Sequence, residues 1–90
     1  MKGMPQKLFD MAQQGVPEDD VQFIFDALIH AEEQGNRFVN VYMNDETAFL
    51  FTNDAKHADQ QLFRMREDAK RKAIGFENVE GNWQERKPLQ

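Results

Sequence analysis

The sequence predicts an α+β domain in which the elements follow the order α-α-β-β-α. The helices are expected to pack on one face of a small antiparallel sheet of two or three strands. Residues 37–52 support this, because two runs of β-branched and aromatic residues flank a polar turn at 44–46. The segments on either side of this pair carry apolar residues at helical spacing. At 90 residues the chain makes one domain, and we expect residues 1–83 to be compact and 84–90 to form a disordered tail.

The first helix is expected over 5–14 and the second over 17–34. Each begins at a proline and ends at a glycine, which are Pro5 and Gly15 for the first helix and Pro17 and Gly35 for the second. Three acidic residues follow Pro17, where the helix dipole favours negative charge.

Two features of the second helix depart from a simple amphipathic pattern. Phe23 lies off its apolar stripe, which runs through Val21 and Ile24. Glu32 and Glu33 lie in the last turn, where their charges oppose the helix dipole. A local rule broken in this way is sometimes functional and more often tolerated.

The strand pair over 37–52 has no polar face in either arm. Alternation divides the first arm into Val39, Val41 and Met43 on one face and Phe38, Asn40 and Tyr42 on the other. In the second arm Ala48 and Leu50 share one face, while Phe49 and Phe51 share the other. Such a pair needs cover on both sides, and the sequence leaves open which face meets the core.

A third helix is expected over 55–73, after three candidate N-caps at Thr52, Asn53 and Asp54. Gly75 is interpreted as its end. The segment 76–83 is polar with isolated apolar residues, and it either folds back on the domain as a short added strand or binds a partner.

Composition excludes several classes of protein. The chain has no cysteine, which rules out disulfides and fits a reducing cytoplasm, where we expect the protein to act. No apolar run approaches the roughly 20 residues of a membrane span, and the first residues do not resemble a signal peptide. The net charge is −5, but residues 1–54 carry −7 and residues 55–90 carry +2. This uneven distribution has two possible explanations. Acidic residues at the start of one helix and basic residues at the end of another would each be favoured by the helix dipole, or the acidic half would form a face for a basic partner.

The residues of known reactive sites are missing. His30 and His57 have carboxylate neighbours but lack the spacing of a metal site such as H-E-x-x-H. No phosphate-binding loop, dinucleotide fingerprint or calcium loop occurs. We therefore expect no enzymatic activity, no metal and no cofactor, and the residues match no family motif.

The function expected from these observations is binding to another protein, in a regulatory or inhibitory role. The interface would be formed by the aromatic residues of the strand pair, which are Phe38, Tyr42, Phe49 and Phe51. We expect a homodimer in which the strand pairs or third helices face each other.

A sharper form of this hypothesis is an inhibitor whose carboxylates mimic a nucleic-acid backbone. The contributing residues would be Asp10, Glu18, Asp19, Asp20, Asp26, Glu32, Glu33, Asp45 and Glu46. Small acidic proteins of viruses or mobile elements would suit this role. The alternative is a protein that binds single-stranded nucleic acid by stacking bases on the four aromatic residues, if these share one sheet face. The acidic net charge disfavours direct binding of nucleic acid.

Overall fold

The computed structural model describes residues 3–43, 46–67 and 72–86, and in them three helices and four strands. The helices are α1 (Gln6–Gln13), α2 (Glu18–Glu33) and α3 (Ala55–Glu67). The strands are β1 (Phe38–Met43), β2 (Thr47–Thr52), β3 (Lys72–Val79) and β4 (Asn82–Arg86). The predicted α+β class is confirmed, and the observed order is α-α-β-β-α-β-β.

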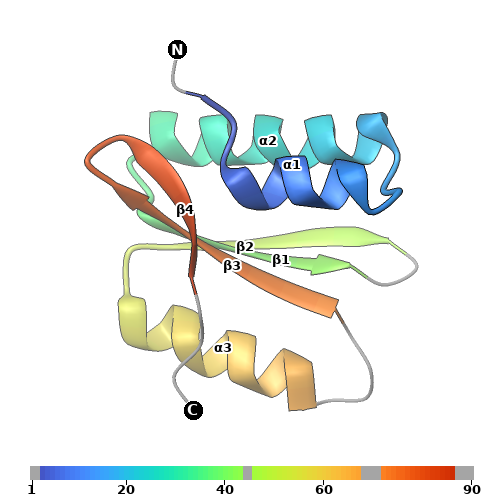
Figure 1. Cartoon of the computed structure of the whole chain (residues 1–90). Coiled ribbons are helices and arrows are strands. Elements are labelled where there is room, and N and C mark those ends of the chain that lie inside the picture. The colour runs from blue at the N-terminus through green and yellow to red at the C-terminus, as the bar shows by residue number, and fades with distance from the viewer. Residues whose placement is uncertain (1–2, 44–45, 68–71, 87–90) are drawn as a thin grey trace.

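The four strands form one antiparallel sheet in the order β2-β1-β3-β4. Helices α1 and α2 lie together on one face of this sheet, and α3 lies across the other (Figure 1). The sheet therefore has more strands than the sequence predicted, and its helices cover both faces instead of one. The reason was visible in the strand pair itself, because both of its faces are apolar and both have to be shielded from water.

The larger part of the core lies between the sheet and the α1–α2 layer. Val39 and Val41 of β1 and Phe76 of β3 point into this layer, and all three are fully buried. The helices contribute the apolar residues Leu8, Met11, Val21, Ile24, Phe25, Leu28 and Ala31. The two positive-φ glycines after these helices, Gly15 and Gly35, end them as predicted.

A smaller core lies between the sheet and α3. Phe38 and Asn40 of β1 are buried on this side, as are Ala58 and Leu62 of α3, and the Asn40 side chain donates a hydrogen bond to the Ala58 carbonyl. Helix α3 approaches the sheet closely over Gly75, where a Cβ atom would lie 2.9 Å from Leu62 Cδ2. The Asp54 side chain caps α3 by accepting hydrogen bonds from the backbone amides at 56 and 57. A cap at 52–54 was therefore predicted correctly.

The helix predicted over 55–73 is wrong at its end. Helix α3 ends at Glu67, residues 68–71 lie outside the described residues, and β3 begins at Lys72. Gly75 is thus not a helix stop but a position inside a central strand, paired with Asn40 of β1 and Arg86 of β4. Alanines at helical spacing suggested a longer helix. The run Ala73–Phe76 is instead buried on both sides, as is typical of a central strand.

The compact part of the chain also extends beyond the predicted limit at residue 83. Strand β4 continues to Arg86, so residues 84–86 belong to the sheet and not to a tail; residues 87–90 lie outside the described residues. A two-residue turn joins β3 and β4, with positive φ at Glu80 (52°) and Gly81 (88°), as in the tight turns that suit twisted hairpins. The segment 76–83 therefore folds back on the domain, which was one of the two alternatives left open by the sequence.

Candidate protein-interaction site

Strand β2 forms one edge of the sheet, and no described strand pairs with its outer side. Its six residues pair with β1 in an unbroken register from Thr47 to Thr52. The strand contains no charged residue, no proline and no bulge, which are the devices that usually keep an edge strand from pairing with another chain. The outer edge of β2 is therefore an unprotected row of backbone donors and acceptors.

Four rings line the same edge, and we call them the edge cluster: Phe23 and His30 of α2, and Phe49 and Phe51 of β2. The Phe49 and Phe51 rings are stacked, with centroids 6.1 Å apart and an interplanar angle of 9°. Phe23 lies against Phe49 at 5.3 Å, and His30 lies against Phe51 at 6.2 Å. These contacts join α2 to the sheet edge.

The edge cluster is only partly covered, although Phe23 and His30 of α2 lie against the edge strand. Phe23 keeps 53% of its surface exposed and Phe51 keeps 36%. Single exposed apolar residues are common, but a contiguous exposed group indicates an interaction surface. Burying the exposed part of each of these rings would contribute about 1 kcal/mol.

The outer side of α2 carries a stripe of carboxylates beside the edge cluster. Asp19, Asp26 and Glu33 are exposed and follow one another at seven-residue intervals, which places them on one stripe. Glu18 and Asp20 are exposed in the first turn. Within the described residues no cation forms an ion pair with any of these five, whereas Asp59, Glu77 and Glu85 elsewhere are all paired.

Phe38 and Tyr42 do not join the predicted aromatic surface. The β1–β2 register places Phe49 opposite Val41 and Phe51 opposite Val39, so both rings share the α2 side. Phe38 and Tyr42 alternate to the α3 side. The four aromatic residues named from the sequence are thus divided into two pairs on opposite faces of the sheet.

Phe38 is buried to 3% exposure beneath two arginines. The Arg86 guanidinium lies 4.6 Å from the centre of its ring and the Arg37 guanidinium lies 5.4 Å from it. Arg86 also forms a two-pronged ion pair with Asp59, with Nε to Oδ1 at 2.7 Å and Nη2 to Oδ2 at 2.8 Å. The hydrogen bond with Asp59 raises the pKa of Arg86, although burial lowers it in part. Phe38 is therefore a structural residue.

Tyr42 is half-buried and takes part in a polar group within the smaller core. Asn40 donates hydrogen bonds from Nδ2 to the Tyr42 hydroxyl at 3.3 Å and to the Ala58 carbonyl at 2.9 Å. Burial raises the pKa of Tyr42, and the hydrogen bond from Asn40 lowers it to a smaller extent. The Asn40 side chain thus ties β1 to α3, and the partly exposed Tyr42 lies on the α3 side of the sheet, away from Phe49 and Phe51.

The remaining predicted acids have different environments. Glu46 is exposed just before β2, Asp10 accepts a hydrogen bond from Gln6, and Asp45 lies outside the described residues. Glu32 accepts a hydrogen bond from the Trp83 indole Nε1 at 3.2 Å. Its unfavourable position at the end of α2 is therefore used to attach β4 to that helix.

Sequence reasoning missed Phe23 and His30 as members of the site. The signal for Phe23 was present, because it lies off the apolar stripe of α2 and so has to meet something other than the main core. His30 follows it by seven residues and shares that side of the helix. The contact with β2 could not be foreseen, since it depends on where α2 crosses the sheet.

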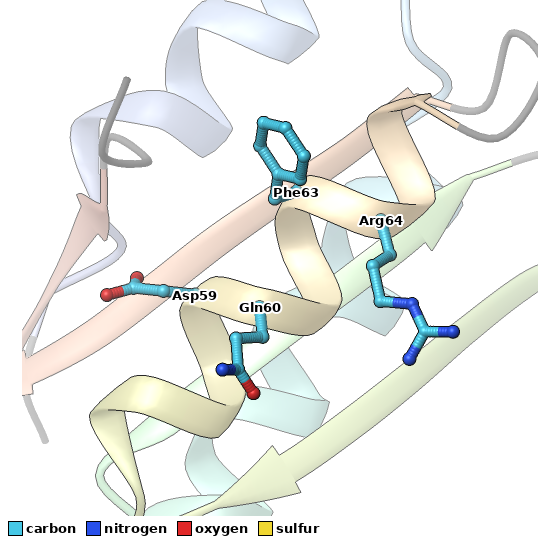
Figure 2. A pocket seen from close by; sticks show the side chains of 4 residues that line it. All are labelled: Asp59, Gln60, Phe63 and Arg64. Carbon is cyan, nitrogen blue, oxygen red and sulfur yellow. The ribbon is translucent and has the colours of Figure 1, made fainter.

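Another exposed phenylalanine, Phe63, lies on the outer side of α3 beside a shallow depression of about 550 Å³. Asp59, Gln60, Phe63 and Arg64 line it, and Figure 2 shows that these side chains project from one helix in different directions. Asp59 is already engaged by Arg86. The depression therefore lacks a convergent set of polar groups.

Two further kinds of feature are absent from the described residues. No group of three or more His, Cys, Asp or Glu side chains is arranged to hold a metal ion in this part of the chain. None of the helices described here has the length and apolar character needed to cross a membrane.

Comparisons with protein-family models, curated proteins and solved structures find no match to this chain.

Proposed function

We propose that this chain is a non-enzymatic binding module that acts by occupying a basic surface on a partner protein. The observation that carries the proposal is the stripe of exposed carboxylates on α2, which lack described ion-pair partners and lie beside the edge cluster. The negative carboxylates steer a basic partner towards α2, and the exposed ring of Phe23 on the same helix supplies apolar contact area. A cytoplasmic location is proposed with it, since the chain has no cysteine.

The use of the buried polar groups supports a non-enzymatic role. Asn40 joins β1 to α3, and the ion pair of Arg86 with Asp59 joins β4 to α3. These groups hold structural elements together and do not converge on a cavity where a substrate could react.

Mimicry of a nucleic-acid backbone is supported only in part. Helix α2 carries six acidic residues over 16 residues, which is about one charge per 4 Å at a rise of roughly 1.5 Å per residue. Double-stranded DNA carries roughly one charge per 1.7 Å. The lower density favours a basic protein surface in general over a site built for DNA.

The alternative of single-stranded nucleic-acid binding loses its main support. Its four-ring stacking surface is not formed, because Phe38 and Tyr42 lie on the opposite face from Phe49 and Phe51. The rings that remain exposed lie next to the carboxylates of α2, which repel phosphates. A gel-shift measurement at low salt is expected to show no retention of single-stranded RNA or DNA.

The proposal is tested by titrating the chain with a lysine-rich peptide at increasing salt. We expect affinity to fall steeply with ionic strength, and the double variant Asp26→Asn/Glu33→Gln to bind several-fold more weakly. The control is Glu67→Gln/Glu80→Gln, which removes the same charge from exposed positions outside α2. Equal affinities for the two variants, or no binding of the peptide, would refute the assignment of the binding face to α2.

A further inference from the structure

We propose that a second copy of this chain pairs its β2 strand antiparallel to β2 across a two-fold axis at Leu50. The two four-stranded sheets would then form one continuous sheet. This self-association goes beyond the binding of a basic partner: it uses the backbone edge of β2 with the Phe49 and Phe51 side chains, whereas the basic partner is recognised by the carboxylates of α2. The choice of a second copy over a foreign strand depends on the sequence and the exposure of β2.

The first argument is that β2 matches itself. Its sequence is nearly symmetric about Leu50, with Phe49 and Phe51 on either side and small residues, Ala48 and Thr52, beyond them. In an antiparallel pair centred on Leu50, Phe49 lies opposite Phe51 of the other copy, and Ala48 lies opposite Thr52. Each apolar position therefore meets an apolar or small residue, as an isologous interface requires.

The second argument is that β2 is incompletely covered on both faces of the sheet, and that pairing with a second β2 would cover both. On the α2 side, Phe51 is 36% exposed and Phe49 is partly buried. On the α3 side, Leu50 is partly buried and Ala48 is exposed. A two-fold axis perpendicular to the sheet keeps equivalent faces together, so the phenylalanines of both copies join on one side and the leucines meet on the other.

The third argument is the state of the strand edge. The other edge strand, β4, carries Glu85 and Arg86 and is tied to the helices on both faces by Trp83 and Arg86. Strand β2 has no comparable protection, since it holds neither charge nor proline. Pairing with a second β2 would satisfy its outward backbone groups.

The two copies of α2 would lie on the same side of the joined sheet, each with its stripe of carboxylates. Their like charges repel one another, and added salt screens this repulsion. Dimerisation is therefore expected to strengthen with salt, whereas binding of a basic partner weakens with salt. The opposite dependences distinguish failure of this inference from failure of the proposed function.

The first test is solution mass by sedimentation or light scattering over a concentration series. We expect a dimer whose dissociation constant rises about tenfold or more in Ala48→Lys, because one charge at the edge enters the symmetric interface twice. Ala48 is exposed, so the substitution leaves the fold intact. Gln60→Lys places the same charge on exposed α3 and should leave the mass unchanged.

The second test fixes the register. The chain has no cysteine, so single cysteines report one position each. Leu50→Cys places two thiols across the axis, where mild oxidation or a short bis-maleimide should link them. Ala48→Cys places them four residues apart along the strands, roughly 13 Å, and should link poorly.

A monomer at every concentration and salt overturns the inference. So does a dimer that Ala48→Lys leaves intact, or one in which Ala48→Cys links as readily as Leu50→Cys. Loss of the dimer in Ala48→Lys together with selective linkage at Leu50 supports it. Circular dichroism of each variant verifies that the fold is retained.

Discussion

Replacing Arg86 with alanine is expected to destabilise the fold by about 3 kcal/mol. Arg86 lies on β4, in a segment that the sequence alone assigned to a disordered tail. Its side chain is 15% exposed and that of Asp59 is 19% exposed. Arg86 also contacts Glu77 at 3.5 Å and covers the ring of Phe38.

The magnitude follows from these contacts. Exposed ion pairs contribute about 0–1 kcal/mol, and breaking a fully buried pair costs about 3–5 kcal/mol. The Arg86 and Asp59 side chains are both about four-fifths buried. The free-energy cost of losing their two hydrogen bonds therefore lies between these limits, at about 2 kcal/mol. The cation–π contact with Phe38 adds about 1 kcal/mol. For a domain of this size, 3 kcal/mol lowers the melting temperature by roughly 12–24 °C.

Urea and thermal unfolding followed by tryptophan fluorescence measure this effect directly. Trp83 is the single tryptophan, it is buried, and it lies on the same strand. Gln84→Ala, at an exposed position of β4, is the control and should change stability by less than about 0.5 kcal/mol. Arg86→Lys keeps the charge but loses the two-pronged geometry, so it should fall between the two.

A double-mutant cycle with Asp59→Asn isolates the ion pair, and we expect a coupling of at least about 1 kcal/mol. The reasoning is refuted if Arg86→Ala is as stable as Gln84→Ala, since a disordered tail would give that result.

Two further predictions concern the smaller core. Gly75→Ala is expected to destabilise by about 1–2 kcal/mol, because the new Cβ lies 2.9 Å from Leu62 Cδ2 and overpacking outweighs the advantage of alanine in a strand; unchanged stability in urea would contradict the close packing. The pKa of Tyr42 is raised by burial, so phenolate absorbance of this single tyrosine should titrate at higher pH in the folded chain than in denaturant. Because the pKa of Tyr42 is higher in the folded than in the unfolded chain, its protonated hydroxyl stabilises the fold fully below about pH 10, and this stabilisation is lost as pH rises through the pKa of the folded chain. Identical titration curves in the folded and the denatured chain would contradict the prediction.

Local signals were sufficient for the first 55 residues. Prolines and glycines mark the ends of α1 and α2, and the alternation of 38–52 marks a hairpin, because these features act through backbone conformation within a few residues. The same signals failed after residue 67. Ala73 and Gly75 fit a helix and its stop, yet both lie in β3, and Gly75 is small because Leu62 of α3 packs directly over it, which is a tertiary cause.

The candidate site was predicted in part. Phe49 and Phe51 lie together as expected, since they alternate on one strand, but their relation to Phe38 and Tyr42 depends on the hairpin register. That register pairs Val41 with Phe49 and so places the two aromatic pairs on opposite faces. Phe23 and His30 reach the site through the crossing of α2 over the sheet, which no short segment of sequence encodes.

The two attachments of β4 have a consequence for the order in which this protein can fold. Trp83 reaches α2 on one face and Arg86 reaches α3 on the other, so both helical layers are attached to a strand of five residues that is synthesised after all of the helices. When synthesis has reached the end of β3, the apolar residues of the three helices and of the first three strands are present, but the contacts of Trp83 with α2 and of Arg86 with α3 cannot yet form. At synthesis rates of about 5–20 residues per second, this interval is brief. Folding of the two layers is therefore expected to be a single late event and not a stepwise one.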